Sequence, residues 1–137
     1  MTAVKVTKQG NVWSTRQVWH NSKESIYMSS PVIGGGRLFG FAPEQGGHFF
    51  CLNAETGETQ WISEENQGTN AALLSTGDLL FTLSDKAMLS VVQENSEGFK
   101  PIQQYKVAET QTWAHPVLVG KRILVKDNTD LYLWSIE

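Results

Sequence analysis

The chain has 137 residues, enough for one domain, and its 11 basic and 14 acidic residues give a net charge of −3. Charges of both signs are interspersed, which excludes the clustered basic face that nucleic-acid binding requires. The sequence has no apolar run of about 18 residues, the length that could span a membrane, and residues 1–8 lack the apolar segment of a signal peptide. The single cysteine, Cys51, excludes an internal disulfide and a multi-cysteine zinc site.

Residues 1–20 contain two expected strands, at about residues 4–7 and 12–19. The whole composition favours short strands joined by tight turns, because the chain holds 12 glycines, 5 tryptophans, 6 phenylalanines and 3 tyrosines. No stretch shows a sustained helical spacing of apolar residues. The two N-terminal strands therefore belong to an all-β chain, and they resemble the last two strands of a larger unit.

A hairpin pattern follows and occurs three times. Residues 31–41, 72–82 and 116–126 each consist of an apolar strand, a turn with glycine and a second apolar strand, and they start 41 and then 44 residues apart. A third strand follows each hairpin, at residues 48–52, 88–92 and 131–136. An aromatic residue recurs 12, 11 and 11 residues before the three hairpins, at Trp19, Trp61 and Tyr105.

Four antiparallel strands repeating at this period describe one blade of a β-propeller. We therefore predict a single propeller segment over residues 1–137, with about three antiparallel four-stranded blades. Because a propeller closes with roughly four to eight blades, the segment is expected to be a partial propeller or half of a dimeric ring. Its predicted parts are the third and fourth strands of a preceding blade at 1–20, whole blades at 31–63 and 71–108, and the first three strands of a last blade at 113–137.

The segment at residues 51–61, CLNAETGETQW, resembles the repeat motif of the PQQ-like, or quinoprotein-type, β-propellers. Thr56 and Gly57 match its turn, where glycine allows a positive φ and the threonine hydroxyl bonds backbone groups. Trp61 matches an aromatic that fills the space between blades, as Trp19 and Tyr105 are expected to do. Asn53 departs from the usual aspartate, and the second copy, at residues 93–98, keeps only its glycine.

Over the whole chain, the resemblance is to the C-terminal part of bacterial PQQ-binding-like repeat proteins. Residues 113–116, WAHP, and 131–134, LYLW, resemble the end of those proteins. In full-length relatives, a strand from the far N-terminus completes the last blade. The resemblance implies a propeller, but a fold does not by itself imply an enzyme.

Two functions follow from the resemblance. The preferred one is a non-catalytic binding or scaffold module that acts through its loop face on a protein or small ligand, as in family members without quinone-site residues, including outer-membrane assembly lipoproteins. The alternative is a fragment of a PQQ-dependent quinoprotein dehydrogenase whose cofactor residues lie outside this chain. Cys51 alone cannot form the disulfide of neighbouring cysteines found in many such enzymes, and residues 127–130 are typical of a turn rather than a Ca²⁺ site. We predict no catalytic, cofactor-binding or metal-binding residue.

The candidate binding residues lie just before the first and third hairpins: Met28, Ser30, Trp113 and His115. Connections between propeller blades gather around one mouth of the central channel, where partners bind. The alternative for Trp113, which the pattern favours, is a structural role between blades like that of Trp61. His20, His48 and His115 occupy different positions of the repeat, so a shared metal site is not expected.

A segment of about three blades would expose an apolar sheet face at each end, which soluble monomers rarely tolerate. We therefore predict either self-association, most simply as a homodimer with six blades, or contact with the remaining blades of a longer parent. A protein partner is possible, whereas nucleic acid and a membrane span are not expected. The family resemblance implies a periplasmic or otherwise exported bacterial protein.

Overall fold

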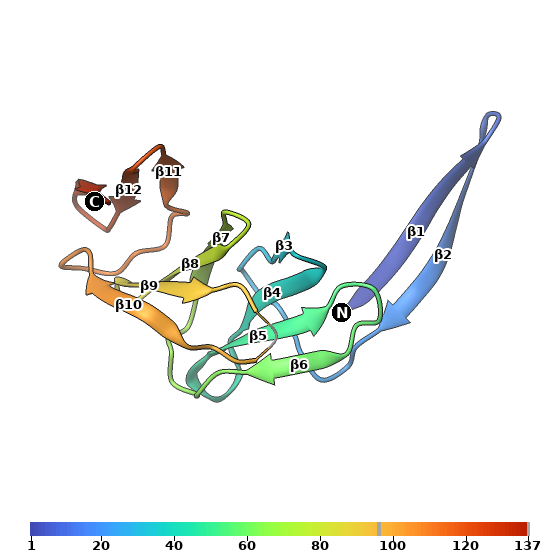
Figure 1. Cartoon of the computed structure of the whole chain (residues 1–137), viewed down its shortest axis with the longest axis horizontal. Helices are drawn as coiled ribbons and strands as arrows, with labels where there is room; N and C mark the ends of the chain where they lie inside the picture. The colour runs from blue at the N-terminus through green and yellow to red at the C-terminus, as the bar shows by residue number, and fades with distance from the viewer. Residues whose placement is uncertain (96, 137) are drawn as a thin grey trace.

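The computed structural model describes residues 1–95 and 97–136, and its regular structure is almost entirely β. Three antiparallel sheets stand side by side, and a long two-stranded hairpin extends away from them at one end (Figure 1). A 3-10 turn, Glu44–Gly46, interrupts the strands. The predicted all-β class, with antiparallel blades amounting to about three, is confirmed.

The sheets follow one another along the chain, and each is a simple meander. The N-terminal hairpin consists of β1 (Thr2–Gln9) and β2 (Val12–His20). Blade 1 consists of β3 (Val32–Gly34), β4 (Arg37–Ala42), β5 (His48–Asn53) and β6 (Thr59–Ile62). Blade 2 consists of β7 (Ala71–Ser75), β8 (Leu79–Ser84), β9 (Met88–Gln93) and β10 (Pro101–Lys106). Blade 3 consists of β11 (Val117–Val119), β12 (Arg122–Lys126) and β13 (Leu131–Ser135).

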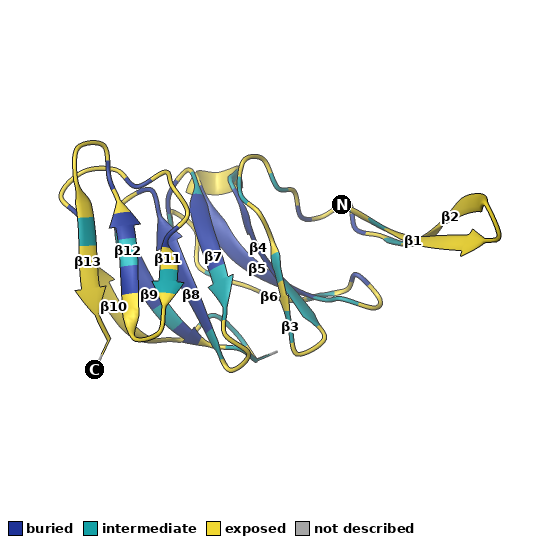
Figure 2. Ribbon diagram, turned by 90° about the horizontal axis from the view of Figure 1, so that it is seen from above, coloured by how far each residue is buried: buried dark blue, intermediate teal, exposed yellow. Residues whose placement is uncertain are grey.

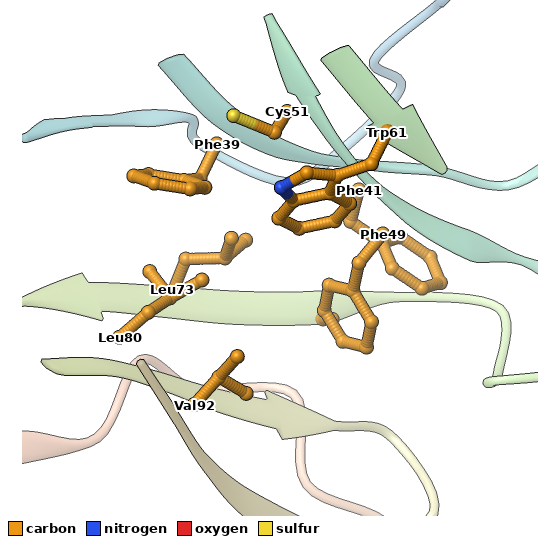
Figure 3. Close-up of a cluster of buried hydrophobic side chains, with 9 residues drawn as sticks. Phe39, Phe41, Phe49, Cys51, Trp61, Leu73, Leu80 and Val92 are labelled. Carbon is orange, nitrogen blue, oxygen red and sulfur yellow. The ribbon is translucent and has the colours of Figure 1, made fainter. Parts of the chain in front are cut away.

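The hydrophobic core lies between the blades rather than inside any one sheet. Between blades 1 and 2, aromatic side chains of blade 1 meet aliphatic side chains of blade 2 (Figure 3). The rings of Phe49 and Phe99 stack with their centres 4.7 Å apart. A second cluster joins blades 2 and 3, with Ile123 and Val125 completely buried. The first cluster contains Phe39, Phe41, Phe49, Cys51, Trp61, Ala71, Leu73, Leu80 and Val92.

Cys51 is part of the first cluster and is fully buried. Burial raises the pKa of its thiol from 9.0 to about 12, which leaves the thiol protonated at neutral pH. The side chain is therefore an unreactive member of the core.

The N-terminal hairpin contacts the rest of the molecule only near its base, and most of its length is exposed (Figure 2). At the base, the Trp19 indole N–H donates a hydrogen bond to the Ala54 carbonyl oxygen (3.0 Å). The Asn21 side-chain amide donates to the Gly57 carbonyl oxygen (2.8 Å). The turn that contains Thr56 and Gly57 thus fixes the hairpin to blade 1.

Two structural features require glycine at position 57. Its φ is +74°, in the left-handed region, and a Cβ there would lie 2.5 Å from the Trp19 ring. Replacing Gly57 with alanine should therefore destabilise the fold through backbone strain of about 1 kcal/mol and through an additional ~1–3 kcal/mol of steric conflict. Urea unfolding followed by tryptophan fluorescence measures this loss.

Gly36 provides a matched control for that experiment. Its φ is also +74°, but no atom lies within 4 Å of a Cβ placed there. Gly36→Ala should show the backbone strain without the steric conflict. Equal destabilisation in the two variants would contradict the contact between Trp19 and Gly57.

Candidate functional site: the loops that enter each blade

The candidate binding residues lie on loops that enter the first strands of blades 1 and 3. Met28 and Ser30 precede β3, and Trp113 and His115 precede β11. Figure 2 shows β3, β7 and β11 running in the same direction, so these loops lie at one end of the row of blades. All four side chains are exposed, and Met28 is 70% and Trp113 48% exposed.

A carboxylate at the end of the second strand of each blade holds the loop that enters the blade. Asp85, after β8, accepts hydrogen bonds from the Thr69 backbone N–H (3.0 Å) and hydroxyl (2.6 Å). In blade 3, Asp127 accepts from the Thr110 backbone N–H (3.1 Å). In blade 1, the Ser25 hydroxyl donates to Glu44.

Asp127 also closes the turn between β12 and β13. One of its oxygens accepts from the backbone N–H groups of Asp130 (2.7 Å) and Thr129 (2.9 Å). These hydrogen bonds lower the pKa of Asp127 far below its ordinary value of 3.8, and the bond from the Asp130 backbone has the largest effect. Bonds from Thr129 and Thr110 lower the pKa further, whereas burial of the carboxyl group opposes the shift. Residues 127–130 therefore form a turn, and Asp127 is its anchor.

The loop before β3 has a second anchor in a buried pair. The His48 Nε2 atom lies 3.0 Å from a Glu24 carboxylate oxygen, and both residues are buried. The Asn21 side-chain oxygen accepts from the Glu24 backbone N–H (3.0 Å), and the Ser29 hydroxyl donates to the Phe41 carbonyl oxygen (3.1 Å). The backbone next to Met28 is thus fixed from both sides.

The loop before β11 is held in the same manner. The Thr112 hydroxyl donates to the Ser84 carbonyl oxygen (2.7 Å), and the Thr112 side chain is buried. Pro116 is buried at the entry to β11. Trp113 and His115 therefore project from a fixed backbone.

The aromatic residues that the sequence places in register have different surroundings. Trp61 is 8% exposed, and its indole N–H donates to the Asn95 carbonyl oxygen of blade 2 (3.0 Å). Tyr105 is 48% exposed and lines a cavity of about 410 Å³ between blades 2 and 3. Trp134 lines the same cavity, and its indole N–H donates to the Val107 carbonyl oxygen (3.0 Å). This cavity lies beside β13, the edge strand of blade 3.

Sequence reasoning missed the carboxylate anchors and the exposed Tyr27. Asp85 and Asp127 are 42 residues apart, within the range of the hairpin repeat, and each has a threonine 16 or 17 residues before it. That double spacing is the signal that could have revealed them. Tyr27 retains 80% of its exposure beside Met28, and only its aromatic character distinguishes it in the sequence.

The three histidines lie in separate places. The Nδ1 atom of His20 lies 2.9 Å from the Thr2 hydroxyl, His48 pairs with Glu24, and His115 is exposed. Within residues 1–95 and 97–136, no three His, Cys, Asp or Glu side chains gather in a way that could hold a metal ion. The same residues include no helix long and apolar enough to cross a membrane.

The sheets pack face to face, are joined by short connections and are entered by loops at one end. This arrangement defines the chain as a β-propeller segment. Solved structures have the same fold. The chain is similar to BamB from Moraxella catarrhalis, with a TM-score of 0.65 and 16% sequence identity over 96% of this chain and 39% of the BamB chain. It thus spans well under half of the BamB chain.

Two computationally designed proteins are also similar in structure. The match to Ika8 has a TM-score of 0.55 at 6% sequence identity, and it covers 96% of this chain and 57% of the Ika8 chain. The match to Ika4 has a TM-score of 0.54 at 7% sequence identity, and it covers 89% of this chain and 99% of the Ika4 chain. At these identities the likeness shows the fold alone. No protein family matches the sequence, and no curated protein is similar to it.

The low pKa of Asp127 has a consequence for stability. A carboxyl group whose pKa is lower in the folded chain than in the unfolded chain stabilises the fold above the unfolded pKa, and this contribution is lost as the pH falls. Asp127→Asn should therefore lower the melting temperature by several degrees at pH 7 and by much less near pH 2, as measured by circular dichroism.

Asp78→Asn is the matched control, because Asp78 is exposed in the turn before β8. This variant should follow the wild type at both pH values. A deficit of Asp127→Asn that stays constant between pH 7 and pH 2 would contradict the role of the Asp127 charge.

Proposed function

We propose that the chain is a non-catalytic β-propeller segment of the PQQ-like type that binds a protein partner through the loops that enter its blades. The observation that carries this proposal is the exposure of Tyr27, Met28 and Trp113 on loops with fixed backbones. Aromatic residues and methionine are enriched where proteins bind one another. A rigid loop also loses little conformational freedom on binding.

Ser30 and His115 complete this loop face with polar side chains. A polar rim around apolar anchors is the usual composition of a protein interface. The exported, bacterial location implied by the family resemblance belongs to the same proposal. It is compatible with the structural likeness to BamB, which shows the fold alone.

The loop face can be tested with a photo-crosslinking amino acid placed at Met28 or Trp113 in bacterial cells. Both positions should yield the same crosslinked protein, identified by mass spectrometry, because both belong to one face. Gln9, exposed on the hairpin away from these loops, is the control position and should yield no such product.

Different proteins at the two positions, or none at either, would contradict a shared partner face. The alternative function makes an opposite prediction for a longer parent that contains the cofactor residues, in which the purified parent with Ca²⁺ binds PQQ in a saturable, stoichiometric manner. Cofactor absorbance would report this binding, and its appearance would overturn the scaffold function.

The proposal includes association with further blades, because both ends of the row present exposed apolar faces. In the hairpin, Val4 pairs with Gln17, Val6 with Thr15 and Lys8 with Trp13 across the strands. Directly paired residues lie on the same face of a sheet, so exposed Val4, Val6 and Trp13 share one face.

Blade 3 presents a similar face at the other end. Ile123 and Val125 of β12 pack against blade 2, so the alternate positions of this sheet face away from blade 2. Four residues at these outward-facing positions are large, apolar and more than half exposed. A contiguous apolar face of this kind marks an interaction surface in soluble proteins. These residues are Val117, Val119, Leu131 and Leu133.

We expect the purified chain to form a homodimer with twice the mass of 15.3 kDa, as measured by light scattering at micromolar concentration. Leu133→Asp should shift this equilibrium to the monomer, because it places a charge on the apolar face of blade 3. Ile102→Asp, at an exposed position of β10 away from both end faces, should leave the dimer intact. A stable wild-type monomer would contradict self-association.

A further inference from the structure

Blades 1 and 2 and the loop that enters blade 2 line a cavity of about 310 Å³, which none of the candidate residues Met28, Ser30, Trp113 and His115 lines. One part of the interface between these blades is apolar, with Leu73, Leu80 and Val92 packed under the aromatic rings of blade 1 (Figure 3). The part that holds the cavity is polar on the side of blade 2. Two kinds of surface therefore occur between the same pair of sheets.

Two buried hydroxyl groups line this cavity without hydrogen-bond partners. Thr82 is 1% exposed and Ser84 is 4% exposed, and both belong to β8. Neither Thr82 Oγ1 nor Ser84 Oγ has a partner among residues 1–95 and 97–136. A buried hydroxyl without a partner costs about 1–3 kcal/mol, so a group inside the cavity is expected to satisfy both.

Other polar groups surround these hydroxyls. The Gln104 side-chain amide donates a hydrogen bond to the Ser90 hydroxyl oxygen (3.0 Å), and both residues line the cavity. Ser90 is the cross-strand partner of Thr82, so the two side chains lie side by side on one face of blade 2. Phe49 of blade 1 supplies an apolar wall on the opposite side.

The rim opens to solvent and is held in place by a contact between the blades. Lys86 and Asn66 are exposed at the rim, and the Lys86 ammonium donates to the Asn66 carbonyl oxygen (2.6 Å). None of the described residues that line the cavity is acidic. The cavity therefore has a fixed entrance and no negative charge.

We propose that this cavity is a binding site for a small neutral polyol, no larger than a monosaccharide. Hydroxyl groups of a polyol can both donate to and accept from Thr82, Ser84 and the Gln104 amide, and the apolar C–H groups of such a ligand fit the Phe49 wall. Among the described residues that line the cavity, one is charged, and its ammonium group, that of Lys86, already has a partner. A neutral ligand therefore matches the site better than an anion.

The volume fits this class of ligand. It lies at the lower end of the roughly 300–1,000 Å³ typical of ligand pockets. About ten water molecules would fill the same space at their usual volume of ~30 Å³ each. Water alone is therefore the alternative occupant that the experiment must distinguish.

The test is a titration of the purified, isotope-labelled chain with glycerol, myo-inositol and glucose, each up to about 20 mM, followed by NMR. At least one polyol should shift the methyl signals of Thr82 and Met88 in a saturable manner, because both residues line the cavity. Thr82→Val should weaken this binding by about tenfold, the effect of losing one good hydrogen bond. The same variant should melt at or above the wild-type temperature, because the hydroxyl has no partner to lose.

Thr7→Val is the matched control, since it makes the same change on the N-terminal hairpin and should leave binding unchanged. Saturable shifts that persist at full affinity in Thr82→Val would overturn the site. The absence of shifts with all three polyols, or shifts with inorganic phosphate alone, would overturn it as well. A lower melting temperature for Thr82→Val would show that the hydroxyl has a structural partner and would also contradict the proposal.

Discussion

Each blade depends on its neighbour through an indole that reaches across the gap between two sheets. The Trp19 N–H donates to the Ala54 carbonyl oxygen of blade 1, and the Trp61 N–H donates to the Asn95 carbonyl oxygen of blade 2. A buried indole N–H needs an acceptor, so the turn of the next blade must present a carbonyl group where the ring lands. Gly57 keeps that place free of a side chain.

This contact changes at the junction of blades 2 and 3. Tyr105 stands where the repeat has a tryptophan, it is half-exposed, and β13 is the edge strand of the three strands that the described residues of blade 3 form. Trp134 of β13 donates instead to the Val107 carbonyl oxygen, at the end of blade 2. The apolar cavity beside β13 follows from these two differences. Within the part of the chain that the structure describes, the junction that departs from the repeat therefore also lies beside the edge strand β13.

The sequence predicted what depends on local pattern and period. The three hairpins, the turn at Thr56 and Gly57, and the all-β class follow from alternating apolar residues and glycine positions. It did not predict the anchors at Asp85 and Asp127, because their threonine partners lie 16 and 17 residues earlier in the chain, too far apart for a local pattern to connect them. In β8, Leu80, Thr82 and Ser84 alternate with Phe81 and Leu83. Such alternation normally indicates a solvated face, whereas here the polar side chains face another blade.

The arrangement of sheets places rigid and open features in different parts of the molecule. The carboxylate anchors keep the loop backbones fixed, so a partner of the kind proposed above would bind exposed Met28 and Trp113 without a large loss of conformational freedom. The end faces have the opposite character, because no further sheet formed by the described residues packs against the hairpin or against the outer face of blade 3. Packing between sheets is the main source of stability in this fold, as the buried clusters between blades indicate. Covering the end faces would therefore stabilise the chain by the same interaction that already joins its blades, and the loops would remain free for a partner.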